Sequence, residues 1–193
     1  MDDTKQFNWS QNSDPNSVAY LRPVQSYDAE EFIDLVNDSH DFLQLWVNPP
    51  SDLNTFHAAI EQSKDDGSIL LLVCMTSDQR ITGSINISQI VFGKFCSAYI
   101  GYWIAKEYAG RGLMTSALQN LIHLALGPFG LHRLEANIQP ANTPSKKLVA
   151  SIGFQKEGLS PKYPKNNDRW EDHERWAIRA ENLPLSPRSS SDS

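Results

Sequence analysis

Residues 98–126 have the sequence AYIGYWIAKEYAGRGLMTSALQNLIHLAL, and two different periodicities meet within them. Residues 98–104 are β-branched and aromatic, as strands are, whereas the apolar positions after Gly112 recur at helical spacing. Gly110 and Gly112 flank Arg111 at the junction. The segment therefore predicts a β-strand, a short glycine loop and a long amphipathic helix in direct succession.

The glycine loop has the properties of an anion-binding site. Glycine adopts backbone angles that a side chain forbids, and it lets the backbone come close to a ligand. The first turn of a helix has unpaired N–H groups and the positive end of the helix dipole, which suit a phosphate or a pyrophosphate. The alternative is an ordinary strand-to-helix turn whose glycines serve only tight packing, and the two glycines alone are compatible with both.

Two common phosphate loops are disfavoured by the residues around these glycines. Leu113 and Met114 follow Gly112, so the Gly-Lys-Ser/Thr of nucleoside triphosphate loops is missing. No third glycine completes a dinucleotide fingerprint. A nucleoside triphosphate or NAD is therefore not the expected ligand.

Composition narrows the class of protein. A length of 193 residues favours one domain with a proper core, and the net charge of −6 argues against general binding to nucleic acid. No apolar run is long enough for a membrane span, and the start MDDTKQ does not resemble a signal peptide, so a cytoplasmic location is the default expectation. Cys74 and Cys96 lack CxxC spacing, so neither a metal site nor a disulfide framework is expected.

Periodicity and turn residues predict the remaining elements and the domain bounds. Residues 1–16 are expected to form a flexible arm on which Trp9 can dock, residues 17–182 one domain, and residues 183–193 a disordered tail. We expect Asp28, Ser51 and Thr143 to cap helices. Strands are expected at 18–24, 69–76, 81–90, 98–104, 132–138, 154–158 and 170–179, and helices after Asp28 and at 39–47, 51–60, 113–126 and 143–152.

Three separated patterns together resemble a known family. They are IGYWIAKEYAGRGLMTSAL at 100–118, NIQPANTPSKKLVASIGFQKEG at 137–158 and RWEDH at 169–173. Over residues 18–182 the chain resembles the GNAT superfamily of acetyl-CoA-dependent N-acetyltransferases, and within it the ribosomal-protein alanine and serine N-terminal acetyltransferases. The resemblance implies an α/β (α+β) GNAT fold: a mixed, mostly antiparallel sheet of about seven strands, splayed at the central strand, with helices on both faces.

The resemblance also implies which residues bind acetyl-CoA. The central strand of this family pairs with the pantetheine arm, a role that corresponds to the backbone of Trp103 and Ile104. Asn142 and Ser145 match positions that contact the coenzyme near the thioester. The pyrophosphate would be held by backbone N–H groups of the loop formed by Ala109, Gly110, Arg111, Gly112, Leu113, Met114 and Thr115.

The chain departs from the family at several positions. Glu107 and Ala109 replace residues that are often Gln or Arg, but neither change removes a backbone donor, so coenzyme binding is expected to survive. Some relatives have a candidate glutamate base in the loop before the last strand, where the matching position here is about Pro164, and others have one on the central strand, where this chain has Tyr99. The residue that acts as base is therefore not identified by the resemblance.

Acetyl transfer needs a neutral amine, donors for the developing oxyanion and a proton for the leaving thiolate. The Ile104 amide is the candidate oxyanion donor and the Ser145 hydroxyl the candidate proton donor, although Ser145 also suits an ordinary first-turn helix position. Tyr99 is a candidate proton relay or, alternatively, a cross-strand aromatic residue. Asp172 and His173 either line the acceptor cleft or lie on a solvated strand face.

The favoured acceptor is the N-terminal α-amine of a protein, for example a ribosomal protein. At pH 7 an α-amine of pKa about 7.7–8.0 is roughly 10% neutral and a lysine of pKa about 10.4 only about 0.04% neutral, so an α-amine needs the weaker base. Two alternatives stay open: acetylation of a small amine, such as an amino acid, polyamine or antibiotic, and a non-catalytic acetyl-CoA-binding module. We expect acetyl-CoA and an amine as partners, no metal, no nucleic acid and no membrane, in a monomer or a homodimer.

Overall fold

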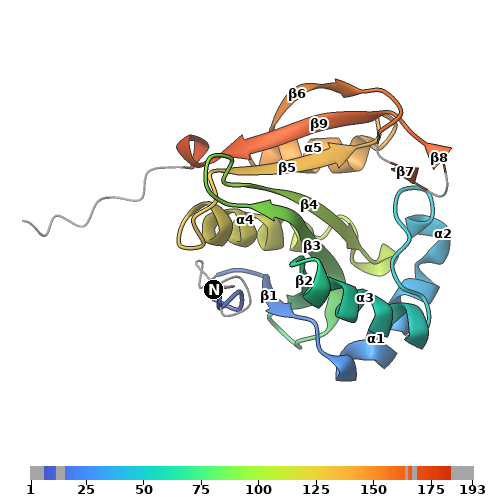
Figure 1. The fold of residues 1–193 in the computed structure, drawn as a ribbon. Coiled ribbons are helices and arrows are strands. Elements are labelled where there is room, and N and C mark those ends of the chain that lie inside the picture. Colours follow the sequence, from blue (N-terminus) through green and yellow to red (C-terminus); the bar gives the residue numbers. More distant parts are fainter. Residues whose placement is uncertain (1–6, 12–15, 164, 167–168, 184–193) are drawn as a thin grey trace, which may run out of the picture.

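The structure is a computed structural model, and it describes residues 7–11, 16–163, 165–166 and 169–183. A seven-stranded sheet runs through the molecule (Figure 1), and only β4 and β5 are parallel within it. This confirms the predicted mixed, mostly antiparallel sheet. The spatial order is β1 (Ala19–Pro23), β2 (Ile69–Met75), β3 (Ile81–Val91), β4 (Ser97–Ile104), β5 (Arg133–Ile138), β9 (His173–Arg179) and β6 (Gln155–Ser160).

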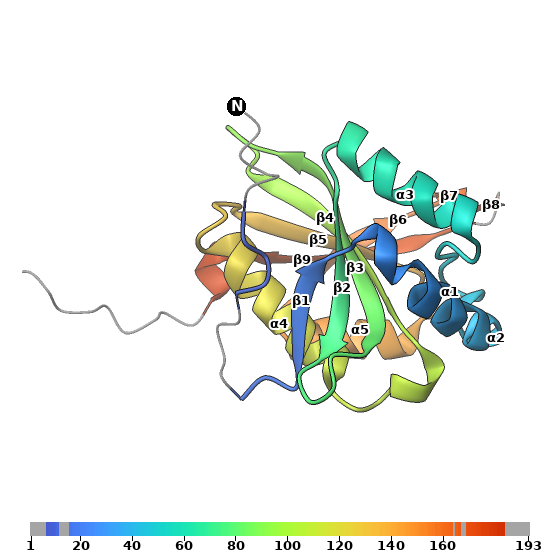
Figure 2. The ribbon, with the colours of Figure 1, turned by 90° about the horizontal axis from the view of Figure 1, so that it is seen from below.

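Helices cover both faces of this sheet, as predicted. The ring of Trp103 in β4 packs 5.3 Å from the ring of Phe32, whereas the next side chain, Tyr102, bonds to Ser145. Because neighbouring strand residues point to opposite faces, the helices that carry Phe32 and Ser145 lie on opposite sides of the sheet. Figure 2 shows the same two layers from below, with α1 (Ala29–Asp38), α2 (His40–Leu43) and α3 (Leu53–Asp65) on one side, and α4 (Leu113–Leu126) and α5 (Thr143–Ser151) on the other.

The core forms where these layers meet. Residues 71–74 of β2 are buried side by side, which agrees with a strand covered on both faces. Helix α4 packs across β1 and β2 and buries most of its length, from Leu113 to Leu126. The central glycine loop is therefore anchored on one side by a buried strand and on the other by a buried helix.

The sheet opens between its two parallel strands. Strand β4 pairs with β5 only at Ser97, Ala98 and Tyr99, whose partner is Glu135, and beyond this point the two strands diverge (Figure 1). On its other side β4 stays paired with β3 as far as Ile104. The edge of residues 100–104 therefore has no strand partner on the β5 side, which confirms the predicted splay.

Asp28 stands at the N-cap position of α1 as predicted but makes no capping bond, and the other two predicted caps differ from the observed ones. Asp28 does not cap α1, because its buried carboxylate is engaged by the Arg22 guanidinium at 2.7–2.8 Å and by the Gln25 N–H. Asp52 rather than Ser51 caps α3 through its carboxylate. Asn142 rather than Thr143 caps α5, its side-chain oxygen accepting the Ser145 N–H. Each true cap lies where its short polar side chain reaches the free N–H groups of the first turn.

Two predicted elements are shorter than expected. The helix predicted at 39–47 ends after α2 at Leu43, and a turn leads from there to Pro49 and Pro50. The strand predicted at 170–179 is divided into β8 (Arg169–Trp170), which pairs with β7 (Lys165–Asn166), and β9 from His173. The interruption has a local cause, because residues 171–172 bond instead to the loop at Lys162 and Tyr163.

Trp9 docks on the body of the domain. Its ring lies 4.7 Å from that of Phe129 and 4.8 Å from that of Phe7, and 2% of the residue is exposed. Residues 1–6 and 12–15 of the predicted arm and 184–193 of the predicted tail lie outside the described residues.

We expect Trp9→Ala to lower the free energy of unfolding by about 3–5 kcal/mol, because a large buried ring is replaced by a cavity. The Trp9 indole N–H has no partner among the described residues, so Trp9→Phe keeps most of the packing and removes an unsatisfied donor. Its expected loss is below about 1.5 kcal/mol. Urea unfolding of the three proteins measures both values, and equal losses for Ala and Phe would contradict the packing argument.

Three further observations concern membrane spans, metal ligands and the cysteines. No helix within the described ranges is both long and apolar enough to cross a membrane. Across the same residues no three His, Cys, Asp or Glu side chains gather as a metal-binding group. Cys74 and Cys96 are both free thiols, the first buried and the second partly buried.

Candidate active site

The glycine loop has the backbone conformation that an anion site needs. Gly110 and Gly112 have φ angles of +76° and +78°, in the left-handed region that favours glycine. A Cβ at either position would meet nothing within 4 Å, so the glycines serve the backbone angles rather than tight packing. No side chain caps α4, and its first intrahelical bond runs from the Ser116 N–H to the Gly112 oxygen. The N–H groups of the first turn thus remain available to a ligand.

Most residues predicted to bind coenzyme line one cavity of about 450 Å³. The cavity extends from the glycine loop along the unpaired edge of β4 to the start of α5. Arg111 is the predicted residue that does not line it, and its guanidinium lies 5.5 Å from the centroid of the Tyr108 ring. The predicted residues in the lining are Trp103, Ile104, Ala109, Gly110, Gly112, Leu113, Met114, Thr115, Asn142 and Ser145.

The sequence analysis missed several residues of this cavity. Phe42, Leu43, Trp46 and Val47, from α2 and the turn after it, close the side opposite β4. Aromatic residues between the first two strands suit either the core or a role in gating the substrate, and Phe42 is 39% exposed and Trp46 half-buried. In the sequence, these residues could have been noticed because they directly precede Pro49 and Pro50, which end the helical pattern.

The split between β4 and β5 contains a smaller cavity of about 70 Å³, called here the split cavity. Residues of β4 and β5 form its two sides, and Tyr102, Asn142, Ser145 and His173 contribute polar groups. The other lining residues are Trp46, Ile100, Gly101, Ala136, Asn137, Ile138 and Gln139. Trp46, Tyr102, Asn142 and Ser145 also line the coenzyme cavity, so the two cavities adjoin.

Tyr102 and Ser145 form a hydroxyl pair inside this region. Their oxygens are 2.5 Å apart, and the Ser145 N–H is held by the Asn142 side chain at 3.1 Å. Burial raises the pKa of Tyr102 to about 12, against the opposing effect of the bond to Ser145. Tyr102 therefore keeps its proton at neutral pH and is a donor. The alternation of strand side chains could have predicted this position of Tyr102. Tyr102 is two residues after Ile100, so both side chains lie on the same face of β4.

Tyr99 lies elsewhere. It is the last β4 residue paired with β5, and it lines neither the coenzyme cavity nor the split cavity. Burial and the nearby Glu135 carboxylate raise the pKa of Tyr99. Because Tyr99 and Tyr102 are three positions apart on one strand, their side chains point to opposite faces. The structure brings Ser145 to Tyr102 and not to Tyr99.

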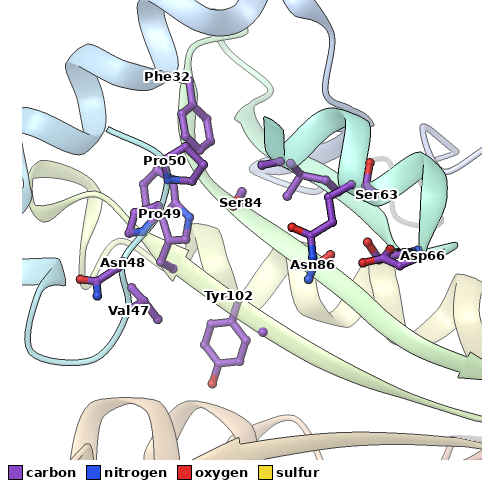
Figure 3. Close-up of a pocket in the computed structure, with 16 residues that line it drawn as sticks. Phe32, Val47, Asn48, Pro49, Pro50, Ser63, Asp66, Ser84, Asn86 and Tyr102 are labelled. Carbon is purple, nitrogen blue, oxygen red and sulfur yellow. Dashed lines mark hydrogen bonds between the residues drawn. The ribbon is translucent and has the colours of Figure 1, made fainter. Parts of the chain in front are cut away.

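A third cavity, of about 290 Å³, lies on the α3 side of the sheet (Figure 3). Ser84 and Asn86 of β3 lie at its floor, Ser63 and Asp66 come from the α3 side, and the Tyr102 side chain points away from α3. Tyr102 also lines the coenzyme cavity and the split cavity. All three cavities therefore meet at Tyr102.

Asp172 and His173 lie in different surroundings although they are adjacent. The exposed Asp172 carboxylate accepts the Lys162 N–H at 2.9 Å, whereas His173 is buried and lines the split cavity. Of the two alternatives, a place in a cleft therefore applies to His173, and a place on a solvated face applies to Asp172.

Comparison with known proteins agrees with this architecture. Residues 19–155 match the acetyltransferase (GNAT) domain family. The chain is 31% identical to the [ribosomal protein uS5]-alanine N-acetyltransferase of Escherichia coli, over 79% of this chain and 83% of that protein. It is 43% identical to the uncharacterized N-acetyltransferase p20 of Bacillus licheniformis, over 77% and 85% of the two chains.

A solved structure has a similar overall fold. Mycobacterium smegmatis RimJ in complex with CoA-disulfide superposes with a TM-score of 0.81 at 29% identity, over 89% of this chain and 87% of that one. A sheet splayed at its central strand, a glycine loop at the start of a buried helix and a family match over most of the domain point to one conclusion. The chain belongs to the GNAT family and is an N-acetyltransferase.

Proposed function

We propose that this N-acetyltransferase transfers the acetyl group of acetyl-CoA to the α-amine of a protein N-terminus, such as that of a ribosomal protein. The observation that carries the proposal is the meeting of three cavities at Tyr102, which gives the coenzyme and an acceptor separate approaches to one point. The choice of acceptor is supported by the similarity to the E. coli uS5-alanine enzyme.

The residues of the coenzyme cavity fit acetyl-CoA. The first-turn N–H groups of α4 suit its pyrophosphate, and the mostly apolar lining along β4 suits an extended pantetheine arm. The free edge of β4 at Trp103 and Ile104 offers backbone groups that no strand occupies on the β5 side. Acetyl-CoA supplies an activated acetyl thioester.

The cavity on the α3 side suits the first residues of a peptide. Its walls are polar and uncharged at Ser84 and Asn86, and the Asp66 carboxylate lies at the C-terminal end of α3. Hydrogen bonds from Ser68 lower the pKa of Asp66, so this carboxylate is negative at neutral pH. A negative charge beside the cavity favours the approach of an N-terminal ammonium group.

The hydroxyl pair supplies the proton that the leaving thiolate needs. Tyr102 and Ser145 lie within hydrogen-bond distance of each other and line both the coenzyme cavity and the split cavity. Either oxygen can donate while the other replaces its proton, so the pair acts as one donor. This extends the role predicted for Ser145 to a residue that the sequence analysis did not name.

The acceptor is tested by thiol release from acetyl-CoA with a panel of amines. We expect release with peptides that begin with Ala or Ser and none with the same peptides blocked at the N-terminus. Peptides whose only amine is a lysine side chain are expected to react at least about 10-fold more slowly at pH 7, because far less of that amine is neutral. Release with small amines alone would overturn the proposed acceptor.

A further inference from the structure

His173 is a buried histidine beside the opening between β4 and β5. It is the first residue of β9, pairs in register with Ser160 of β6 and is 6% exposed. Its side chain lines the split cavity together with Tyr102 and Ser145. His173 and the hydroxyl pair therefore border the same small cavity of about 70 Å³.

The surroundings of the ring determine which nitrogen carries the proton. Nδ1 lies 3.0 Å from the backbone oxygen of Glu171. A carbonyl oxygen has no proton to donate, so Nδ1 is the donor, and in the neutral ring Nε2 carries the lone pair. The described residues give Nε2 neither a hydrogen bond nor an ion pair. A ring oriented through one nitrogen, with a lone pair on the other, suits a proton acceptor.

No other side chain of the described cavity lining has the properties of a base. The lining contains no carboxylate and no lysine, and its other titratable side chain is Tyr102. Tyr102 holds its proton, because burial raises its pKa to about 12. His173 is thus the group in this lining whose nitrogen lone pair can accept a proton.

We propose that Nε2 of His173 is the general base that deprotonates the acceptor amine. The proposal rests on the proposed function, in which the acceptor reaches the point where the cavities meet. The acceptor ammonium gives one proton to Nε2 and becomes a neutral amine. Its lone pair forms the C–N bond to the acetyl carbon while the C–S bond breaks.

Two further protons move during the reaction, and both are exchanged with the Tyr102–Ser145 pair. The sulfur of the leaving thiolate takes a proton from the Tyr102–Ser145 pair, and the second proton of the new amide nitrogen returns to that pair. Nε2 then releases its proton to water. The net result is an amide, a free thiol and one proton in solution.

A histidine base also agrees with an α-amine as acceptor. The pKa of an α-amine is about 7.7–8.0 and that of a lysine side chain about 10.4. Whichever base takes the proton, an α-ammonium therefore gives it up several-hundred-fold more readily than a lysine ammonium does, by roughly the ratio of the two acid constants. The acidity of the acceptor thus favours the same substrate class.

Charged groups surround His173 on several elements and contribute to any pH profile. Glu174 forms ion pairs with Lys156 of β6 at 2.8 Å and Lys146 of α5 at 3.5 Å, and Asp172 bonds to the loop at Lys162. The titratable groups near the ring are Glu171, Asp172, Glu174, Lys146, Lys156, Lys162 and, on β4, Tyr102.

His173→Asn tests the proposal, because asparagine can still donate an N–H to the Glu171 oxygen but has no atom equivalent to Nε2. The acceptor is whichever amine the wild-type enzyme acetylates fastest. At pH 7 we expect kcat/KM to fall by about 100-fold, the size of a lost general base. At pH 9.5, where an α-amine is already neutral, the deficit is expected to shrink below about 5-fold. Added imidazole is expected to restore part of the rate.

The matched control is His57→Asn, an exposed histidine of α3 that lines none of the three cavities. It is expected to retain wild-type activity at both pH values. Binding of CoA within about threefold of wild type shows that the His173 variant is folded, and His173→Gln takes its place if it is not.

Two results would overturn the assignment of His173 as the base. One is activity of the variant within about threefold of wild type at pH 7, and the other is a deficit that stays constant with pH, as a merely structural role predicts. Turnover of small amines alone would contradict the proposed peptide acceptor, but the effect of His173→Asn would still be measured with that amine.

Discussion

Gly112→Glu is expected to abolish binding of acetyl-CoA. Gly112 is the residue immediately before α4, and its neighbour Leu113 begins the turn whose N–H groups point toward the anion site. A glutamate there places a negative charge and a side chain where the pyrophosphate is expected. Repulsion between like charges at a desolvated contact costs several kcal/mol, so we expect the dissociation constant to rise by at least about 100-fold. Isothermal calorimetry with CoA measures the change.

Gly112→Ala is the matched control for backbone strain. At φ +78° any residue other than glycine is strained, by roughly 1–3 kcal/mol, but a Cβ at Gly112 meets nothing within 4 Å. Both variants should therefore lose similar thermal stability, a few degrees in Tm, while only the glutamate variant loses the coenzyme. Tight CoA binding by Gly112→Glu would show that the glycine loop is not the pyrophosphate site.

Tyr102→Phe and Ser145→Ala are expected to reduce kcat by about 100-fold each, the typical contribution of a proton donor. The two hydroxyl oxygens are 2.5 Å apart, so each variant breaks the same pair. Phenylalanine keeps the aromatic ring of a residue that lines the coenzyme cavity, so coenzyme affinity is expected to stay within about threefold.

The double variant tests whether the two residues act as one unit. Independent contributions would multiply, so that kcat falls by about 10⁴-fold. A shared role predicts a loss close to that of the more damaging single variant. Full activity of Tyr102→Phe would contradict a role for Tyr102 in proton transfer and leave Ser145 as the donor.

Local sequence patterns were sufficient to predict the central strand, the glycine loop and the helix that follows it. The change of periodicity around Gly110 and Gly112 predicted β4, the loop and α4, and the observed strand and helix begin within one residue of the expected positions. These elements follow from nearby residues, because alternation, helical spacing and glycine backbone angles are local properties. The predicted helix caps were wrong for a related reason. A cap depends on which polar side chain is engaged elsewhere, as Asp28 is by Arg22.

The sequence by itself determined the seven-stranded GNAT architecture, the glycine loop and just over half of the residues that line the coenzyme cavity. Only the tertiary structure decided which side chains meet at the split in the sheet. Tyr102 and Ser145 are 43 residues apart in the chain, and His173 comes from a third element, β9. Such contacts are set by the pairing of distant strands and by the end of β4–β5 pairing at Tyr99, and no local periodicity contains that information.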